Sequence, residues 1–318
     1  MATTQLTRGT PAHRRGRRGA RQTRQVSKQG RLAFWLLLPA AVVVFGVIVY
    51  PVVRTVLISF FEVNSAVPVT TPFVGIRNYV DIFTDAGFWS SIRHTLYFTL
   101  VSTGLELVLG MALALLLNAP LKARWLFRAI VVLPWALPTV VNGAMWQGVL
   151  NAQYGSLNAL LTQLHVIGDY HSWLGTPFSA LNMLVLADVW KTTPLVAFFL
   201  LTGLQSVPQE IYESARVDGA GAVGGFFRIT LPLLVPSVAV VLVLRTIDAF
   251  KVFDLVYILT GGGPANGTQT VAFYTYVQAF SDQRFGFGSA LADVIVVCIL
   301  VLSAIYLRAL RRSEMSLL

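Results

Sequence analysis

The hydrophobic positions of the chain gather in long, uninterrupted runs that shorter polar stretches separate. A helix rises about 1.5 Å per residue, so about 20 apolar residues cross the roughly 30 Å hydrocarbon core of a bilayer. The pattern therefore predicts an all-α polytopic membrane protein with six transmembrane helices. We expect them at residues 32–53, 95–117, 127–150, 180–201, 233–257 and 288–307.

The composition agrees with this pattern. Of 318 residues, 55% are hydrophobic and only 12% are charged, whereas about a quarter are charged in a soluble domain. So high an apolar content excludes a largely disordered chain. The single cysteine, Cys298, excludes a disulfide scaffold. The four histidines have no metal-ligand spacing, so we expect neither a metal site nor catalysis in this chain.

The bases of the chain are concentrated at its N-terminal end. Residues 1–31 hold nine Lys or Arg and no acid, which predicts a disordered basic tail that rests on anionic lipid. A nucleic-acid-binding arm and a cleaved signal peptide are alternatives, but the long apolar run that follows favours an uncleaved first span. With the N-terminus inside, seventeen bases fall in the inner segments and four in the outer ones.

The positive-inside rule then places both termini in the cytoplasm. This orientation gives a basic cytoplasmic tail at 1–31, a transmembrane domain at 32–310 and a cytoplasmic C-terminal tail at 311–318. The protein would be a multi-pass protein of a cell membrane, with membrane lipid around it and no nucleic-acid partner.

The inner loop at 205–232 predicts a helix, a turn and a second short helix. Pro208 is tolerated in a first helical turn and Gly219 supplies a helix end. We expect Pro232 to end the second helix, so that the fifth span begins there.

Charged residues also occur inside the predicted spans. On the fifth span four residues of alternating sign follow one another at intervals of three: Arg245, Asp248, Lys251 and Asp254. Neighbours three apart on a helix can pair, which predicts a ladder that neutralises itself. It is either a polar path for a solute or a set of ion pairs that fixes helix packing. Asp188 and Lys191 repeat the pattern on the fourth span, whereas Glu106 and Asp293 are lone acids that we expect to have partners.

The loop motif resembles a known family. Residues 213–220 read Glu-Ser-Ala-Arg-Val-Asp-Gly-Ala and 229–232 read Ile-Thr-Leu-Pro, which is similar to the EAA loop of binding-protein-dependent ABC importer permeases. Ser214 stands where the motif has Ala. Further segments resemble the carbohydrate-uptake subfamily of maltose and trehalose permeases; they lie at 73–79, 188–194, 245–254 and 259–264.

The resemblance implies an ABC type I importer permease fold whose loop docks on a cytoplasmic ATPase. The contact residues would be Glu213, Ala215, Asp218, Gly219 and Ala220. The expected partners are a second homologous permease, two copies of the ATP-binding subunit and an extracytoplasmic solute-binding protein. ATP and Mg would be bound by the ATPase, since this chain has no Gly-x-x-x-x-Gly-Lys-Ser/Thr run.

The resemblance also implies positions for a sugar site. The aligned positions are Trp135, Thr139, Lys191, Thr192, Arg245, Ala249 and Val252. Asp248 and Lys251 join them from the charged ladder, whereas Ala249 and Val252 cannot form hydrogen bonds through their side chains. The predicted function is ATP-driven import of a di- or oligosaccharide by alternating access. Import of a glycerophosphate-type solute and a stand-alone secondary carrier are the alternatives; the balanced charges of the ladder favour a neutral solute.

Overall fold

The computed structural model describes residues 34–64, 71–120 and 122–315. The prediction of a basic tail at 1–31 therefore lies outside the described residues. The chain divides into two compact units, residues 1–57 and 58–318. The described part of the first unit is an apolar helix that begins at Phe34 and runs on to Ile58. It contains the π-helical stretch η1 (Val44–Val49) and then α2 (Tyr50–Ile58).

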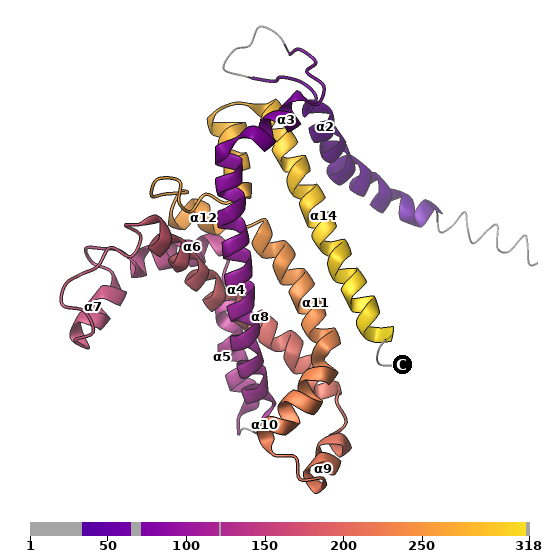
Figure 1. The fold of residues 1–318 in the computed structure, drawn as a ribbon, viewed down its shortest axis with the longest axis vertical. Helices are drawn as coiled ribbons and strands as arrows, with labels where there is room; N and C mark the ends of the chain where they lie inside the picture. Colours follow the sequence, from indigo (N-terminus) through magenta and orange to yellow (C-terminus); the bar gives the residue numbers. More distant parts are fainter. Residues whose placement is uncertain (1–33, 65–70, 121, 316–318) are drawn as a thin grey trace, which may run out of the picture. The chain divides into compact units, whose positions relative to one another are not determined.

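The second unit is built from helices joined by short connections (Figure 1). Their order is α3 (Arg77–Thr84), α4 (Ala86–Asn118), α5 (Arg124–Ala136), α6 (Thr139–Val149), α7 (Ser156–Gln163), α8 (Pro177–Ser206), α9 (Gln209–Val217), α10 (Ala222–Gly225), η2 (Phe226–Thr230), α11 (Leu231–Phe250), α12 (Asp254–Leu259), α13 (Val271–Tyr276), η3 (Val277–Ser281) and α14 (Phe285–Met315). Five helices among the described residues could cross a membrane by length and composition, and a bent pair makes a possible sixth.

The bent pair is the predicted third span. Instead of one straight helix, α5 and α6 meet at an angle of 90°. Leu137 between them has φ −71° and ψ 134°, an extended conformation. The residue before a proline is pushed out of the helical region by the proline ring, and Leu137 precedes Pro138. The predicted span over 127–150 is therefore broken at this point into two helices.

The fifth span differs from the prediction at both ends. One helix runs from Ala222 to Phe250 without a stop at Pro232, because the π-helical turn η2 comes just before this proline at the start of α11. Such a turn accommodates a residue that cannot continue the regular hydrogen-bond ladder. The helix then ends at Phe250 rather than near residue 257, so Lys251 already lies outside it.

The most extensive contact between two helices of the unit is that of α4 with α8, which lie side by side (Figure 1). Ala114, Leu200 and Leu234 are fully buried in a cluster that joins these two helices to α11. Gly110 allows the close approach of α4, since a Cβ there would lie 2.6 Å from Val196. Small residues at such positions are a common means of packing membrane helices.

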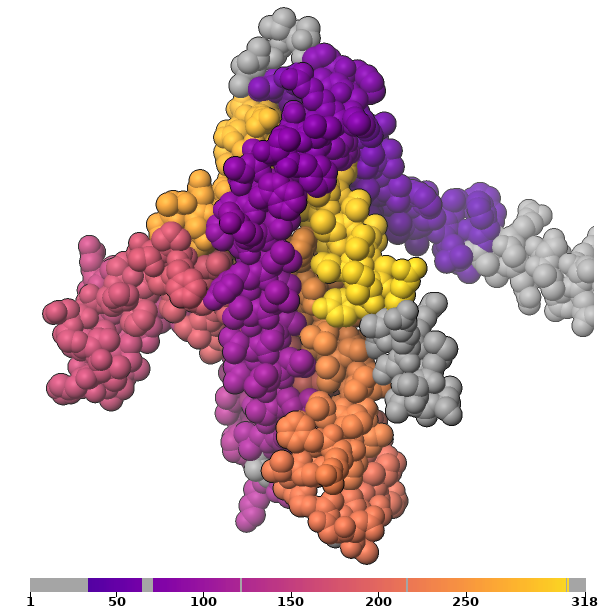
Figure 2. Space-filling model, viewed as in Figure 1, coloured from indigo at the N-terminus to yellow at the C-terminus, as the bar shows by residue number. Residues whose placement is uncertain are grey.

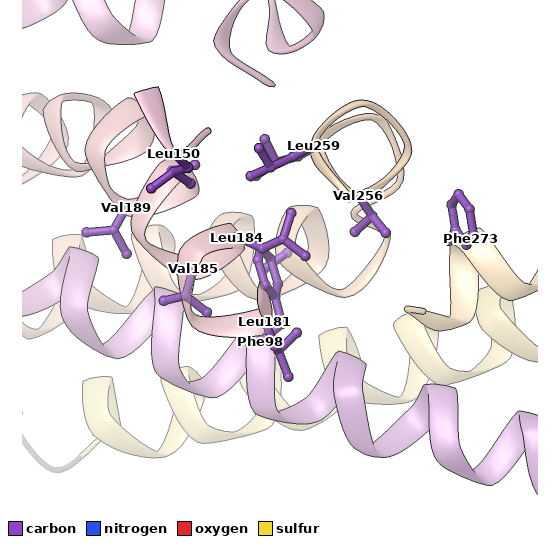
Figure 3. Close-up of a cluster of buried hydrophobic side chains, with 12 residues drawn as sticks. Phe98, Leu150, Leu181, Leu184, Val185, Val189, Val256, Leu259 and Phe273 are labelled. Carbon is purple, nitrogen blue, oxygen red and sulfur yellow. The ribbon is translucent and has the colours of Figure 1, made fainter. Parts of the chain in front are cut away.

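A second buried cluster fixes α6 and α12 against the same pair of helices. Figure 3 shows Phe98 of α4 and Leu184 of α8 pointing towards one another, with Leu150, Val256 and Leu259 beside them. Beyond this cluster, the segment around α6 and α7 stands out to one side of α4 (Figure 2). The bend between α5 and α6 therefore lies next to this buried cluster.

At the end of the unit remote from α9, the short helix α3 packs on α14 (Figure 1). Ile82 and Leu291 are fully buried between them. The Tyr79 hydroxyl donates a hydrogen bond of 2.9 Å to the Asp293 carboxylate, so this lone acid has the partner that the sequence predicts. Burial raises the pKa of Tyr79, and the phenol stays protonated at neutral pH.

Candidate functional site

A cavity of about 350 Å³ opens beside the bend between α5 and α6. Its other walls are α8, the C-terminal end of α11 and the first residues of α12. Of the nine positions named from the sequence, the seven with aromatic, charged or hydroxyl side chains all line it: Trp135, Thr139, Lys191, Thr192, Arg245, Asp248 and Lys251. Residues from four separate helices and the end of a fifth thus meet at one place.

The deepest charge of the cavity is the guanidinium of Arg245, and two carboxylates hold it. Its Nε and Nη2 atoms donate to the two oxygens of Glu106 at 2.6 and 2.8 Å, and Nη2 also donates to Asp188 at 3.0 Å. The side chains of Arg245 and Glu106 are 7% and 0% exposed. A bidentate pair of this kind is among the strongest side-chain contacts. It ties α4, α8 and α11 together.

This pairing corrects the sequence-based ladder. Arg245 was expected to pair with Asp248 along its own helix, but its partners come from two other helices. Glu106 was expected to have a partner, and that partner is Arg245. The signal was present, since Glu106 is one of two lone acids in the spans and Arg245 is a base that must also be neutralised there.

The second expected pair, Asp188 with Lys191, does not form either. The Asp188 carboxylate bonds to Arg245, while Lys191 Nζ donates to Thr139 Oγ1 at 2.7 Å. Thr192 Oγ1 turns back to the carbonyl of Asp188 at 2.8 Å. Lys191 therefore has a neutral partner, and its ammonium group keeps further donors for a solute in the cavity.

The last three residues of the ladder, Asp248, Lys251 and Asp254, are exposed to solvent. Lys251 Nζ lies 3.1 Å from Asp248 Oδ1, with the side chains 56% and 52% exposed. Asp254 is exposed and begins the next helix, α12. The helix end at Phe250 separates these charges, so the four residues do not share one helix face.

Aromatic and apolar side chains complete the wall. Trp135, at the last turn of α5, is 47% exposed. Val252 lines the cavity as predicted, but Ala249 is buried in the core and does not. Sequence reasoning missed Phe253, Leu195 and Leu255 as lining residues, because an apolar side chain in a span gives no signal of its own.

The predicted coupling loop is a helix followed by a sharp turn. Gly219 has φ +81°, in the left-handed region that favours glycine. The amide of Ala220 donates to the carbonyl of Ala215 at 2.9 Å, which closes α9 with a Schellman motif. Glu213, Asp218 and Gly219 are exposed, and Ala215 and Ala220 are half-buried. The five predicted coupling residues thus lie at one protruding end of the unit (Figure 1).

A hollow of about 510 Å³ lies between α9 and the helix that follows the turn. Tyr212 lines it from α9 and Phe226 lines it from η2. Thr230 Oγ1 contacts the hydroxyl of Tyr212 at 3.4 Å, which links the two sides. The hollow leaves the apolar inner face of the turn accessible next to the exposed polar residues.

Residues 106–314 match the protein family described as the binding-protein-dependent transport system inner membrane component. The chain belongs to this family of ABC importer permease subunits, which are not themselves catalytic. Among similar proteins is the trehalose/maltose transport system permease protein MalF of Thermococcus litoralis, 42% identical over 88% of this chain and 94% of that protein. The sulfoquinovosyl glycerol permease SmoG of Agrobacterium fabrum is 40% identical over 89% and 91%. The trehalose permease SugA of Mycobacterium tuberculosis is 37% identical over 87% and 88%.

A solved structure confirms the fold. A chain of a bacterial ABC transporter involved in the import of the acidic polysaccharide alginate superimposes with a TM-score of 0.80. The match covers 92% of this chain and 99% of that chain at 24% sequence identity. A second structure of an alginate transporter, in complex with a pentasaccharide-bound periplasmic protein, gives a TM-score of 0.78 over 91% and 96%. The all-α importer permease fold expected from the sequence is therefore confirmed.

Proposed function

We propose that this chain is the permease subunit of an ATP-driven importer for a neutral di- or oligosaccharide. The observation that carries the proposal is the cavity beside the α5–α6 bend. It combines an exposed indole, Trp135, with hydroxyl, ammonium and carboxylate groups. Binding sites for polar ligands pair a flat apolar wall with a few placed polar groups. Two of the similar proteins are a trehalose/maltose permease and a trehalose permease, which supports the same class of solute.

The charge of the cavity supports a neutral solute. Three bases and three acids line it: Lys191, Arg245 and Lys251 against Asp188, Asp248 and Asp254. Glu106 lies behind Arg245 and adds a fourth acid. The guanidinium of Arg245 is already held by two carboxylates, so it is not free to bind a phosphate or sulfonate. A glycerophosphate-type solute would meet a site with a formal excess of negative charge.

The coupling part of the proposal concerns partners. The turn at Gly219 would dock on a cytoplasmic ATP-binding subunit, present in two copies, and a second homologous permease would complete the cavity. An extracytoplasmic solute-binding protein would deliver the sugar to the opposite end. Both termini would then be cytoplasmic. ATP and Mg would be bound by the ATPase, and the permeases would alternate between two orientations by rigid-body rocking.

The test is uptake by the reconstituted transporter with its partner subunits. Labelled trehalose, maltose, a trisaccharide, glycerol 3-phosphate and a sulfonated glycoside are compared with and without ATP. We expect saturable, ATP-dependent uptake of neutral sugars only. Uptake of the phosphate in preference to every sugar would contradict the proposal. Uptake driven by an ion gradient without ATP would identify a secondary carrier instead.

A lysine variant then tests the cavity itself. Lys191→Met removes the ammonium group that lies 2.7 Å from Thr139, and we expect the KM for the preferred sugar to rise about ten-fold, as for the loss of one charged hydrogen bond. Lys122→Met makes the same change outside the cavity and serves as the matched control. An unchanged KM in Lys191→Met would remove this residue from the site.

The coupling turn is tested by Gly219→Val. A β-branched residue at φ +81° is strained, so the turn must change shape. We expect sugar-stimulated ATP hydrolysis to fall at least ten-fold while solute binding by the delivery protein is unchanged.

The orientation of the chain in the membrane is tested by cysteine labelling, in a variant in which Cys298 is replaced by Ala and a cysteine is placed at Asp218. Labelling of this cysteine only from the outside of intact cells would contradict the proposed orientation.

A further inference from the structure

A line of aromatic rings leads away from the cavity towards the end of the unit that carries α3. The first ring is that of Phe253, just before α12, and the others lie in α12, α13, η3 and the start of α14. We call these five residues the aromatic track: Phe253, Tyr257, Tyr276, Phe280 and Phe285. Phe253 lines the cavity, and its ring centroid lies 5.1 Å from that of Tyr276. The centroid of Tyr276 lies 5.4 Å from that of Phe280, which in turn lies 5.7 Å from that of Phe285.

We propose that the aromatic track is the route by which the sugar travels between the outer mouth and the cavity. The proposal rests on the proposed function. A pyranose ring has one face made of C–H groups, and these carry a partial positive charge that suits the electron-rich face of an aromatic ring. Rings about 5–6 Å apart let a sugar pass from one to the next without losing contact completely.

The track is accessible rather than part of the core. Phe280 is 61% exposed and Tyr257 is 47% exposed, whereas the neighbouring Phe273 is buried at 6% and supports the rings from behind. Phe273 stacks on Phe253 with the planes 26° apart and the centroids 6.0 Å apart. The support fixes the ring that stands at the cavity edge, so a flat surface is available there before any sugar arrives.

Polar groups accompany the rings, as a sugar requires. The hydroxyl-bearing rings of Tyr257 and Tyr276 lie with their centroids 5.6 Å apart, and the neighbouring Tyr257 raises the pKa of Tyr276, so its phenol stays protonated at neutral pH. At the outer end, Arg284 Nη1 donates to Gln278 Oε1 at 2.9 Å, and Gln278 Nε2 donates to Asp282 at 2.7 Å. These charged groups flank Phe280 and Phe285 in the chain.

Two other occupants of the track are conceivable: lipid chains and the second permease. A surface that faces hydrocarbon has no reason to carry tyrosine hydroxyls on its rings and charged residues, Asp282 and Arg284, next to them in the chain. The track also continues directly into the cavity, because Phe253 belongs to both. These two observations favour the sugar.

The test uses the reconstituted transporter and replaces a ring by a side chain of similar apolar volume. Phe280→Leu and Tyr276→Leu keep hydrophobic contact but lose the flat face. We expect each to raise the KM for labelled disaccharide uptake roughly five-fold, the size of one aromatic stacking contact. Phe280→Tyr restores a ring and should return the KM to the wild-type value. Phe178→Leu changes an exposed phenylalanine outside the track and is the matched control.

The outcomes separate the two proposals. A wild-type KM in both leucine variants would overturn the track, and so would a Phe280→Tyr variant as defective as Phe280→Leu. Loss of co-purification of the second permease from the leucine variants would show that the rings hold the partner, which also overturns it. If Lys191→Met impairs uptake while the leucine variants do not, only the track fails. If the wild-type transporter imports no sugar, the proposed function fails first.

Discussion

The two ends of one charged stretch behave differently in this protein. Arg245 lies at the buried end, where Glu106 and Asp188 from two other helices complete a triad. Asp248 and Lys251 lie at the exposed end, where they pair with each other. In sequence the two ends look alike, with opposite charges three residues apart.

The difference between the ends lies in what surrounds them. A buried charge must be matched by partners with good geometry, because the loss of hydration is otherwise not offset. An exposed pair is solvated in either arrangement and contributes little to stability. The buried triad therefore serves the structure, while the exposed pair keeps its groups available for a solute. The following four changes test this division.

Arg245→Met should have the largest effect on stability. The substitution leaves Glu106 and Asp188 as adjacent carboxylates without their shared partner, and breaking a buried ion pair in this way costs about 3–5 kcal/mol. Thermal unfolding of the purified transporter in detergent should show a large fall in the melting temperature. A melting temperature close to that of the wild type would mean that the triad does not hold α4, α8 and α11 together.

Glu106→Gln should have an intermediate effect. The amide keeps the shape of the side chain, and Arg245 retains Asp188, so we expect a cost of about 1–3 kcal/mol, typical of one lost charged hydrogen bond. The double variant with Arg245→Met should cost less than the two single changes added together. Strict additivity in this unfolding cycle would show that the two side chains do not interact.

Asp188→Asn should cost less, about 1 kcal/mol, since Arg245 keeps its bidentate contact with Glu106. Its effect on transport should be more informative. The variant removes one negative charge from the cavity wall, so we expect weak uptake of an anionic solute that the wild type rejects. Competition by glycerol 3-phosphate against labelled sugar measures it, and no gain in competition would contradict the charge argument.

Lys251→Met should have the smallest effect on stability. An exposed pair contributes about 0–1 kcal/mol, so the melting temperature should hardly change and should be insensitive to salt. The KM for sugar should nevertheless rise, because an ammonium group at the cavity wall is lost. A large fall in stability together with a normal KM would reverse the roles that we assign to the two ends.

Much of the fold could be predicted from the apolar runs. The runs at 95–117, 180–201 and 288–307 lie within α4, α8 and α14, because length and hydropathy alone determine them. The bend at Leu137 was not predicted. The prolines indicated a disturbed backbone there, but the angle depends on what α6 packs against, which is a contact between distant segments.

The sequence predicted which residues belong to the candidate site, but it did not predict which of them form ion pairs. The seven substrate-site residues named from resemblance and charge line one cavity, although their role in binding stays a prediction. The pairing was wrong because a helical interval shows which residues can meet on one helix, whereas Arg245 finds its partners on two others. The sequence also gave no indication that α11 ends at Phe250, because neither Lys251 nor Val252 is a helix-breaking residue.

The right-angled break at Leu137 and Pro138 also restricts where this subunit can exist. The final carbonyls of one helix and the first amides of the next have no partners within their own helices. Hydrocarbon cannot satisfy such groups, so backbone of this kind occurs at membrane depth only against water or another protein surface. The side of the chain that carries the break must therefore face away from lipid, and a solitary copy surrounded by acyl chains would leave these groups unsolvated.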